Sequence, residues 1–161
     1  MSAMKWTMGF IKGVVALVFI WFLSASSALA FHVEDPVAER QEIMKHVGTA
    51  MKYLTPVFAQ KAVWNESRLL ESTKTIKDNI HPELFQLFQF HVTPTEDSRS
   101  KMNINSSWED FELRLTELSQ LADALLIQIP QGHAVAQETF RAMVKNCSGC
   151  HKRYRNKIND R

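Results

Sequence analysis

The first regular pattern of apolar and polar residues along the chain runs from 36 to about 58. Asp35 and Pro36 supply a helix N-cap and a first helical residue. Pro56 falls near the end of the stretch, where it is expected to kink or terminate a helix. Apolar residues recur at spacings of three, four and seven: Val37, Met44, Val47, Met51, Leu54 and Phe58. The pattern predicts an amphipathic helix that buries this face.

A second helix is predicted from about 63 to 80. It ends before His81, because the residue ahead of a proline disfavours helical geometry. A short helical turn is expected over 83–90, whereas the polar, proline-containing stretch 93–105 is predicted to be a loop. The expected inward-facing residues of these segments are Trp64, Leu69, Leu70, Ile76, Ile80, Leu84, Phe85, Leu87 and Phe88.

Two longer helices are predicted in the C-terminal half. The third begins at Ser107 and ends at Pro130, and the fourth runs from about 134 to 157. Glu109 and Asp110 place negative charge in the first turn of the third helix, where it suits the helix dipole. The expected inner faces are Phe111, Leu115, Leu118, Leu121, Leu125 and Ile129, then Phe140, Met143, Val144, Cys147, Tyr154 and Ile158. Four amphipathic helices without a strand pattern predict an all-α, antiparallel four-helix bundle.

The N-terminal segment 1–30 has the composition of a secretory signal peptide. Lys5 and Lys12 supply positive charge ahead of the apolar run 14–23, and residues 28–30 read Ala-Leu-Ala, a small-x-small cleavage site. The apolar run is short for a membrane span, which needs about 20 residues. We therefore expect cleavage, a mature domain of 31–161 with no membrane span, and export to the periplasm of a bacterium. An uncleaved N-terminal anchor is the alternative.

The charge of the predicted mature domain is nearly balanced. The whole chain has 19 basic and 17 acidic residues, and loss of the two lysines in the signal segment leaves 17 of each. A domain without excess positive charge lacks the electrostatic signature of nucleic-acid binding. Nucleic acid is therefore not an expected partner.

The motif at 147–151, Cys-Ser-Gly-Cys-His, carries the most specific chemistry of the sequence. It matches the C-x-x-C-H pattern for covalent haem attachment and uses both cysteines of the chain. The thiols of Cys147 and Cys150 would add to the haem vinyl groups, and His151 would bind the iron as proximal ligand. A redox disulfide would need a βαβ context, and a zinc site would need four ligands, so neither alternative suits this sequence. One haem c per chain is predicted.

The candidates for the opposite iron ligand lie on the first predicted helix. Met44 and Met51 are seven residues apart and share a face, with Gly48 between them where a flat macrocycle could approach. Methionines at helical spacing also serve as core residues. The remaining histidines are poor candidates. His46 points away from Met44, and His133 is separated from the motif by about 27 Å of helix.

Three stretches of the sequence resemble class II c-type cytochromes, the cytochrome c′ and cytochrome c-556 group. They are 40–51, which reads Arg-Gln-Glu-Ile-Met-Lys with a glycine and a methionine following, Trp-Glu-Asp at 108–110, and 147–155. The sequence departs from the family pattern over 87–91, where family members often have a Phe-Pro pair. The resemblance implies a four-helix bundle with haem bound to the last helix.

The resemblance also implies roles for individual residues. It makes Met44 the distal ligand and places Arg40, one helical turn away, near a haem propionate. An exposed charge is the alternative for Arg40. The resemblance places Arg155 in the haem pocket on the proximal side. Alternatively, Arg155 is part of a basic helix end that would complement the helix dipole.

Two functions of different classes follow from these observations. The first is a periplasmic monohaem electron carrier with a six-coordinate His/Met iron, no catalytic residue and a redox partner protein. The second is a five-coordinate cytochrome c′ that binds nitric oxide or carbon monoxide. A structural bundle without haem is a third possibility, and we do not expect an enzyme. The oligomeric state is expected to be a monomer or a homodimer.

Overall fold

The computed structural model describes residues 35–89 and 98–157 of the chain. The predicted signal peptide and its cleavage site lie outside these residues, as do Phe90, Ile158 and the first part of the predicted loop. None of the helices in the described ranges is both long enough and apolar enough to cross a membrane.

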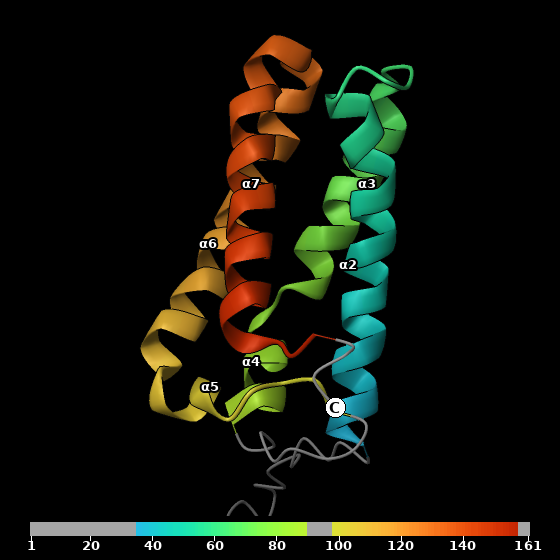
Figure 1. Ribbon diagram of the computed structural model, residues 1–161. Helices are drawn as coiled ribbons and strands as arrows, with labels where there is room; N and C mark the ends of the chain where they lie inside the picture. Colours follow the sequence, from blue (N-terminus) through green and yellow to red (C-terminus); the bar gives the residue numbers. More distant parts are fainter. Residues whose placement is uncertain (1–34, 90–97, 158–161) are drawn as a thin grey trace, which may run out of the picture. The chain divides into compact units, whose positions relative to one another are not determined.

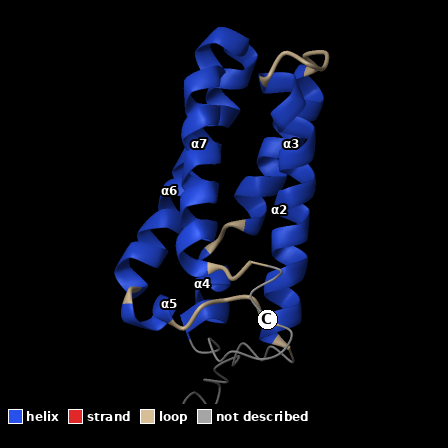
Figure 2. Ribbon diagram, in the orientation of Figure 1, coloured by secondary structure: helices blue, strands red, loops and turns tan. Residues whose placement is uncertain are grey.

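Four long helices form the bundle, and Figure 1 shows their arrangement. They are α2 (Pro36–Phe58), α3 (Glu66–Asn79), α6 (Trp108–Gln128) and α7 (His133–Tyr154). The connections carry the short helices α4 (Pro82–Gln89) and α5 (Asn103–Ser106) and the single 3₁₀ turn η1 (Ile129–Gln131). Within the described residues there is no strand, only one isolated antiparallel bridge between Ser100 and Arg155 (Figure 2). The predicted four-helix bundle is confirmed.

The helices pack as two pairs. α2 packs along α3, α6 packs along α7, and α3 joins the pairs through α6. α2 and α7 make few direct contacts with each other. Of the neighbouring long helices, α2 and α7 therefore pack least closely against each other.

The core consists of the apolar faces that the sequence pattern indicates. Leu54, Leu69, Ile76, Leu125, Ile129 and Met143 are fully buried. One predicted inward position is wrong, because Val144 is 38% exposed. Several others, including Met44 and Met51, are only half-buried. An apolar stripe on a helix is wider than the part of it that reaches the core.

Side-chain caps set the starts of α2 and α3. Asp35 Oδ1 accepts hydrogen bonds from the backbone N–H groups of Val37 (2.9 Å) and Ala38 (3.0 Å), as the N-cap prediction requires. α3 begins at Glu66, three residues later than predicted, because Asn65 Oδ1 caps the N–H of Arg68 (3.0 Å). The residues just before Asn65 therefore lie outside the helix.

The end of α7 also differs from the prediction. The helix stops at Tyr154 instead of 157, because the backbone of Arg155 is extended (φ −124°, ψ 132°). The Lys101 N–H donates to the Tyr154 carbonyl (2.9 Å), and the Asn156 N–H donates to the Arg99 carbonyl (2.8 Å). Residues 98–101, here called the strap, thus pair with the chain that follows α7. The predicted loop is wrong at its end, where 103–105 belong to α5.

Candidate haem-binding site

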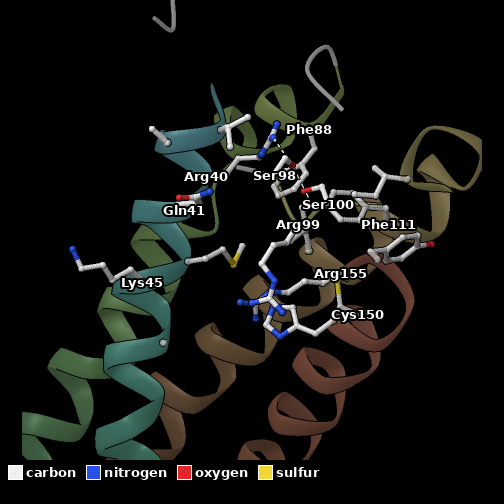
Figure 3. Close-up of a pocket in the computed structure, with 18 of the residues that line it drawn as sticks. Arg40, Gln41, Lys45, Phe88, Ser98, Arg99, Ser100, Phe111, Cys150 and Arg155 are labelled. Carbon is white, nitrogen blue, oxygen red and sulfur yellow. Dashed lines mark hydrogen bonds between the residues drawn. The ribbon is translucent and has the colours of Figure 1, made fainter. Parts of the chain in front are cut away.

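A pocket of about 890 Å³ lies between α2 and the C-terminal end of α7 (Figure 3). α4, α6 and the strap complete its walls. Its volume is within the range of about 300–1,000 Å³ that small-molecule and cofactor sites occupy. The lining residues are Asp35, Val37, Ala38, Arg40, Gln41, Met44, Lys45, Gly48, Phe88, Ser98, Arg99, Ser100, Ile104, Phe111, Leu115, Cys150, His151, Tyr154 and Arg155.

The predicted haem-attachment motif lies in the last turns of α7. Cys150 and His151 line the pocket, and Cys147 is half-buried one turn earlier on the helix. Burial raises the pKa of the Cys147 thiol and raises that of Cys150 to about 11. The pKa of His151 is lowered by burial and by the charges of Arg155 and Arg99. A lowered pKa favours the neutral imidazole, which is the form that binds iron.

The opposite wall of the pocket is formed by α2. Met44 and Gly48 line it, whereas Met51 is not among the lining residues. A Cβ atom at Gly48 would meet no heavy atom within 4 Å, so this part of the helix faces open space. The structure thus brings Met44 and His151 to one pocket from helices that are distant in sequence.

The described histidines other than His151 lie away from the pocket lining. His46 pairs with Glu42 on the surface of α2 (Nε2 to Oε1, 3.2 Å). His133 hydrogen-bonds to the Phe58 carbonyl oxygen at the far end of the bundle (3.1 Å). His81 pairs with a neighbouring glutamate, and His32 and His91 lie outside the described residues.

Arg40 is a buried cation on the wall of the pocket, only 4% exposed. Its Nη1 donates to the Leu87 carbonyl (2.6 Å), and its Nη2 donates to Ser98 Oγ (3.4 Å). The guanidinium carbon also lies 5.0 Å from the centre of the Phe88 ring. Burial lowers the pKa of this arginine. The interpretation of Arg40 as an exposed surface charge is therefore wrong.

Two further arginines line the pocket near the end of α7. Arg155 follows the helix directly, and Arg99 comes from the strap. Arg99 donates from Nε (3.1 Å) and Nη2 (2.6 Å) to the Asn156 carbonyl. Burial and the charge of Arg99 lower the pKa of Arg155. Sequence reasoning missed Arg99, because nothing in a polar loop indicates that Arg99 hydrogen-bonds to Asn156.

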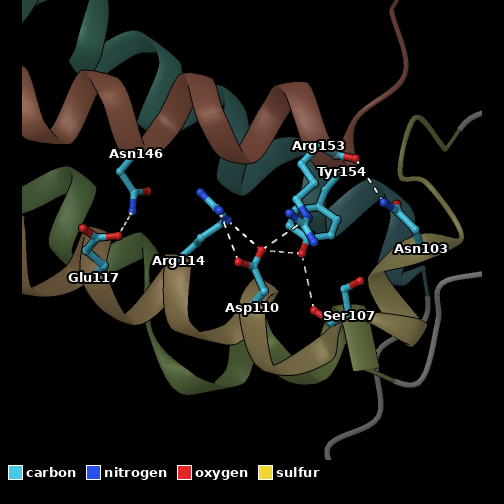
Figure 4. A network of polar contacts seen from close by, with 8 residues as sticks. All are labelled: Asn103, Ser107, Asp110, Arg114, Glu117, Asn146, Arg153 and Tyr154. Atoms are coloured by element: carbon cyan, nitrogen blue, oxygen red, sulfur yellow. Dashed lines mark hydrogen bonds and ion pairs between the residues drawn. The ribbon is translucent and has the colours of Figure 1, made fainter.

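A polar network ties this end of α7 to α6 (Figure 4). Asp110 Oδ2 accepts from Arg114 Nε (2.8 Å) and from the Tyr154 hydroxyl (2.5 Å). These hydrogen bonds, with that from Arg114 as the largest cause, lower the pKa of Asp110 to about 2. A Cβ atom at Gly149 would lie 3.4 Å from Arg114 Nη1, so a side chain of α6 lies against the motif. The helix end that carries the motif is thus fixed by hydrogen bonds.

Comparison with protein families gives one match, the model described as Cytochrome C', over residues 35–155. Cytochrome c-556 from Agrobacterium fabrum is 24% identical over 128 residues, which cover 78% of this chain and 84% of that protein. Cytochrome c-556 from Agrobacterium tumefaciens strain B2A is 26% identical over 121 residues, covering 74% of this chain and 95% of that protein.

Solved structures share the fold at low sequence identity. Cytochrome c' from Rhodopseudomonas palustris has a TM-score of 0.71 at 23% identity and covers 79% of this chain and 100% of that one. A variant of cytochrome c prime from Alcaligenes xylosoxidans, in ferrous form with bound NO, has a TM-score of 0.68 at 17% identity, covering 77% and 95%. Because the family model matches residues 35–155, which is most of the sequence and includes α2 and α7, the chain belongs to the Cytochrome C' family.

Proposed function

We propose that the protein is an exported monohaem electron carrier whose iron is held between His151 and Met44. The family binds haem c covalently, and the residues around the pocket fit that cofactor. The observation that carries the proposal is the placement of Met44 on α2 and His151 on α7 as opposite walls of one pocket. When bound, haem supplies an iron that cycles between the ferric and ferrous states.

Each predicted residue has a distinct part in this proposal. The thiols of Cys147 and Cys150 hold the haem covalently, and His151 donates a ring nitrogen to the iron. Met44 offers a thioether, a ligand that favours the ferrous state and suits electron transfer. Arg40 presents guanidinium donors to a haem carboxylate. Among the described residues, four cationic side chains and one acidic side chain line the pocket, which supports binding of a group with two carboxylates.

The proposed cellular setting rests on the signal segment. Export to the periplasm is proposed from residues 1–30, and the partner is proposed to be another redox protein. No catalytic residue is proposed. The chain is proposed to act as a monomer or a homodimer.

Gas binding is the second candidate function. Among the structural neighbours, the variant from Alcaligenes xylosoxidans is described with bound NO. In this chain Met44 is only half-buried on the wall of the pocket. A distal face of this kind could admit a diatomic gas if the thioether does not bind the iron.

Substitution of Met44 separates the two functions. In an electron carrier, Met44→Ala converts a low-spin spectrum into a high-spin one and allows carbon monoxide to bind the ferrous protein. Met51→Ala is the matched control, because Met51 lies on the same helix, is also half-buried and does not line the pocket. A Met44→Ala spectrum identical to that of the wild type would contradict ligation by Met44.

A further inference from the structure

Arg99 is a pocket residue for which the sequence gives no role. It lies in the strap, whose backbone pairs with the residues just after α7 through the Ser100–Arg155 bridge. Its Nε and Nη2 both donate to the Asn156 carbonyl, so the planar guanidinium is fixed in orientation. A guanidinium has five N–H donors. Nη1 makes no recorded hydrogen bond within the described residues, and Arg99 lines the pocket.

The charges around Arg99 indicate what it would bind. Figure 3 shows Arg99 and Arg155 extending into the pocket from the same side. Arg40 lies on another wall and already donates to the Leu87 carbonyl. Asp35 is the one acidic residue of the lining within 35–89 and 98–157. Among the residues that the structure describes, no carboxylate of the lining lies beside these two guanidinium groups, which favours an anionic ligand there, and haem carries two carboxylates.

We propose that Arg99 binds one haem carboxylate at a position separate from Arg40, and that its charge raises the reduction potential of the iron. The inference rests on the proposed haem function. A guanidinium matches a carboxylate with two parallel hydrogen bonds, and the bond to Asn156 sets its direction beforehand. A positive charge near the iron disfavours the ferric state, which has one more positive charge than the ferrous state. The strap therefore sets the potential as well as covering the pocket.

The test compares Arg99→Gln and Arg99→Lys in the haem-loaded protein. We expect Arg99→Gln to shift the ferrous-to-ferric ratio at a fixed potential about fivefold towards ferric. At 59 mV for each tenfold change, this is about 40 mV. Arg99→Lys keeps the charge and should stay within about twofold of wild type. Lys145→Gln, which removes an exposed charge from α7 outside the pocket lining, is the control and should leave the potential unchanged.

A second measurement reports the carboxylate contact itself. The propionate-bending band in the resonance Raman spectrum moves to lower frequency when a propionate loses hydrogen bonds. We expect this shift in Arg99→Gln and a smaller one in Arg99→Lys, because one ammonium replaces a two-pronged donor. If Arg99→Gln does not fold, the Raman band of Arg99→Lys tests the contact. A band at the wild-type position would then contradict a hydrogen bond from Arg99 to the propionate.

Other outcomes would overturn the inference. A lower unfolding temperature in Arg99→Gln with an unchanged potential and Raman band would mean that Arg99 only ties the strap to Asn156. If the reduction potential falls as much in Arg99→Lys as in Arg99→Gln, the cause is a displaced structure and not the lost charge. A high-spin wild-type protein with these same variant effects would refute the electron carrier and keep the role of Arg99. A wild-type protein without covalent haem would refute both.

Discussion

At one end of the bundle α2 and α7 are joined by aromatic rings, whereas at the other end a pocket of about 890 Å³ lies between them. Phe58 of α2 stacks on Phe140 of α7 with ring centroids 4.2 Å apart, and Trp64 and His133 pack against Phe58. At the pocket end, α7 is held instead by hydrogen bonds to α6 and to the strap. Apolar packing therefore joins the two helices at the aromatic end, and polar contacts fix α7 where a cofactor would separate it from α2.

The largest effect is expected from Phe140→Ala at the aromatic end. Phe140 is 5% exposed and stacks on Phe58, so its loss leaves a cavity that should cost about 3–5 kcal/mol of unfolding free energy. Urea unfolding of the haem-loaded protein measures this cost. The visible spectrum should not change, because the substitution is remote from the pocket lining. An altered spin state would show that the two ends are not independent.

A smaller loss is expected from Arg40→Met at the pocket end. Arg40 is buried and donates to the Leu87 carbonyl, and hydrogen bonds to charged groups contribute about 1.5–3 kcal/mol. Urea unfolding should show a loss of this size, together with a propionate Raman band at lower frequency. Lys52→Met is the matched control, since Lys52 lies on the same helix, is exposed and does not line the pocket. Equal stability of both variants would refute a structural role for Arg40.

The network around Asp110 predicts a pH dependence. The pKa of Asp110 is lowered from 3.8 to about 2 by Arg114 and Tyr154. A carboxyl with a lower pKa in the folded state stabilises the fold above pH 4, and this contribution is lost as the pH falls towards 2. Asp110→Asn should melt a few degrees below wild type at pH 7, with a gap that closes near pH 2. The effect is modest because solvent screens this partly exposed pair.

Thermal melts at several pH values measure this gap. Glu109→Gln is the control, because Glu109 is exposed on the first turn of the same helix and outside the network. A gap between wild type and Asp110→Asn that stays constant from pH 7 to pH 2 would contradict the role of the Asp110 charge.

The smallest effect concerns electron exchange at the basic end of α7. Lys152, Arg153 and Arg155 give this end positive charge, so anionic reagents should be attracted to it. Oxidation of the ferrous protein by the anion hexacyanoferrate(III) should slow as salt screens the attraction. Oxidation of the ferrous protein by a cationic cobalt(III) complex should not slow. Rates for the anion that do not change with salt would remove this end as the docking surface.

The sequence indicated the main elements of the site because their signals are local. The motif at 147–151 is contiguous, and the face shared by Arg40, Met44 and Gly48 follows from the helical period. The structure brings both to one pocket, as the bundle requires, while their binding roles stay predictions. The four helices were predictable for the same reason, although the caps of α3 and the end of α7 were not.

Arg99 and the strap show where sequence reasoning ends. Their positions depend on hydrogen bonds between residues 99–101 and 154–156, which are more than 50 residues apart and follow no periodic pattern. The burial of Arg40 depends similarly on α4, because the Leu87 carbonyl has to reach the guanidinium. Long-range pairing of irregular segments leaves no local trace in a single sequence.

The most direct test of the central claim is the absorption spectrum of the purified wild-type protein, recorded in ferric and ferrous forms with and without carbon monoxide. With His151 and Met44 both bound to the iron, both forms are low-spin, and carbon monoxide leaves the ferrous spectrum unchanged. A high-spin protein whose ferrous form binds carbon monoxide at once would contradict the account and establish the gas-binding alternative.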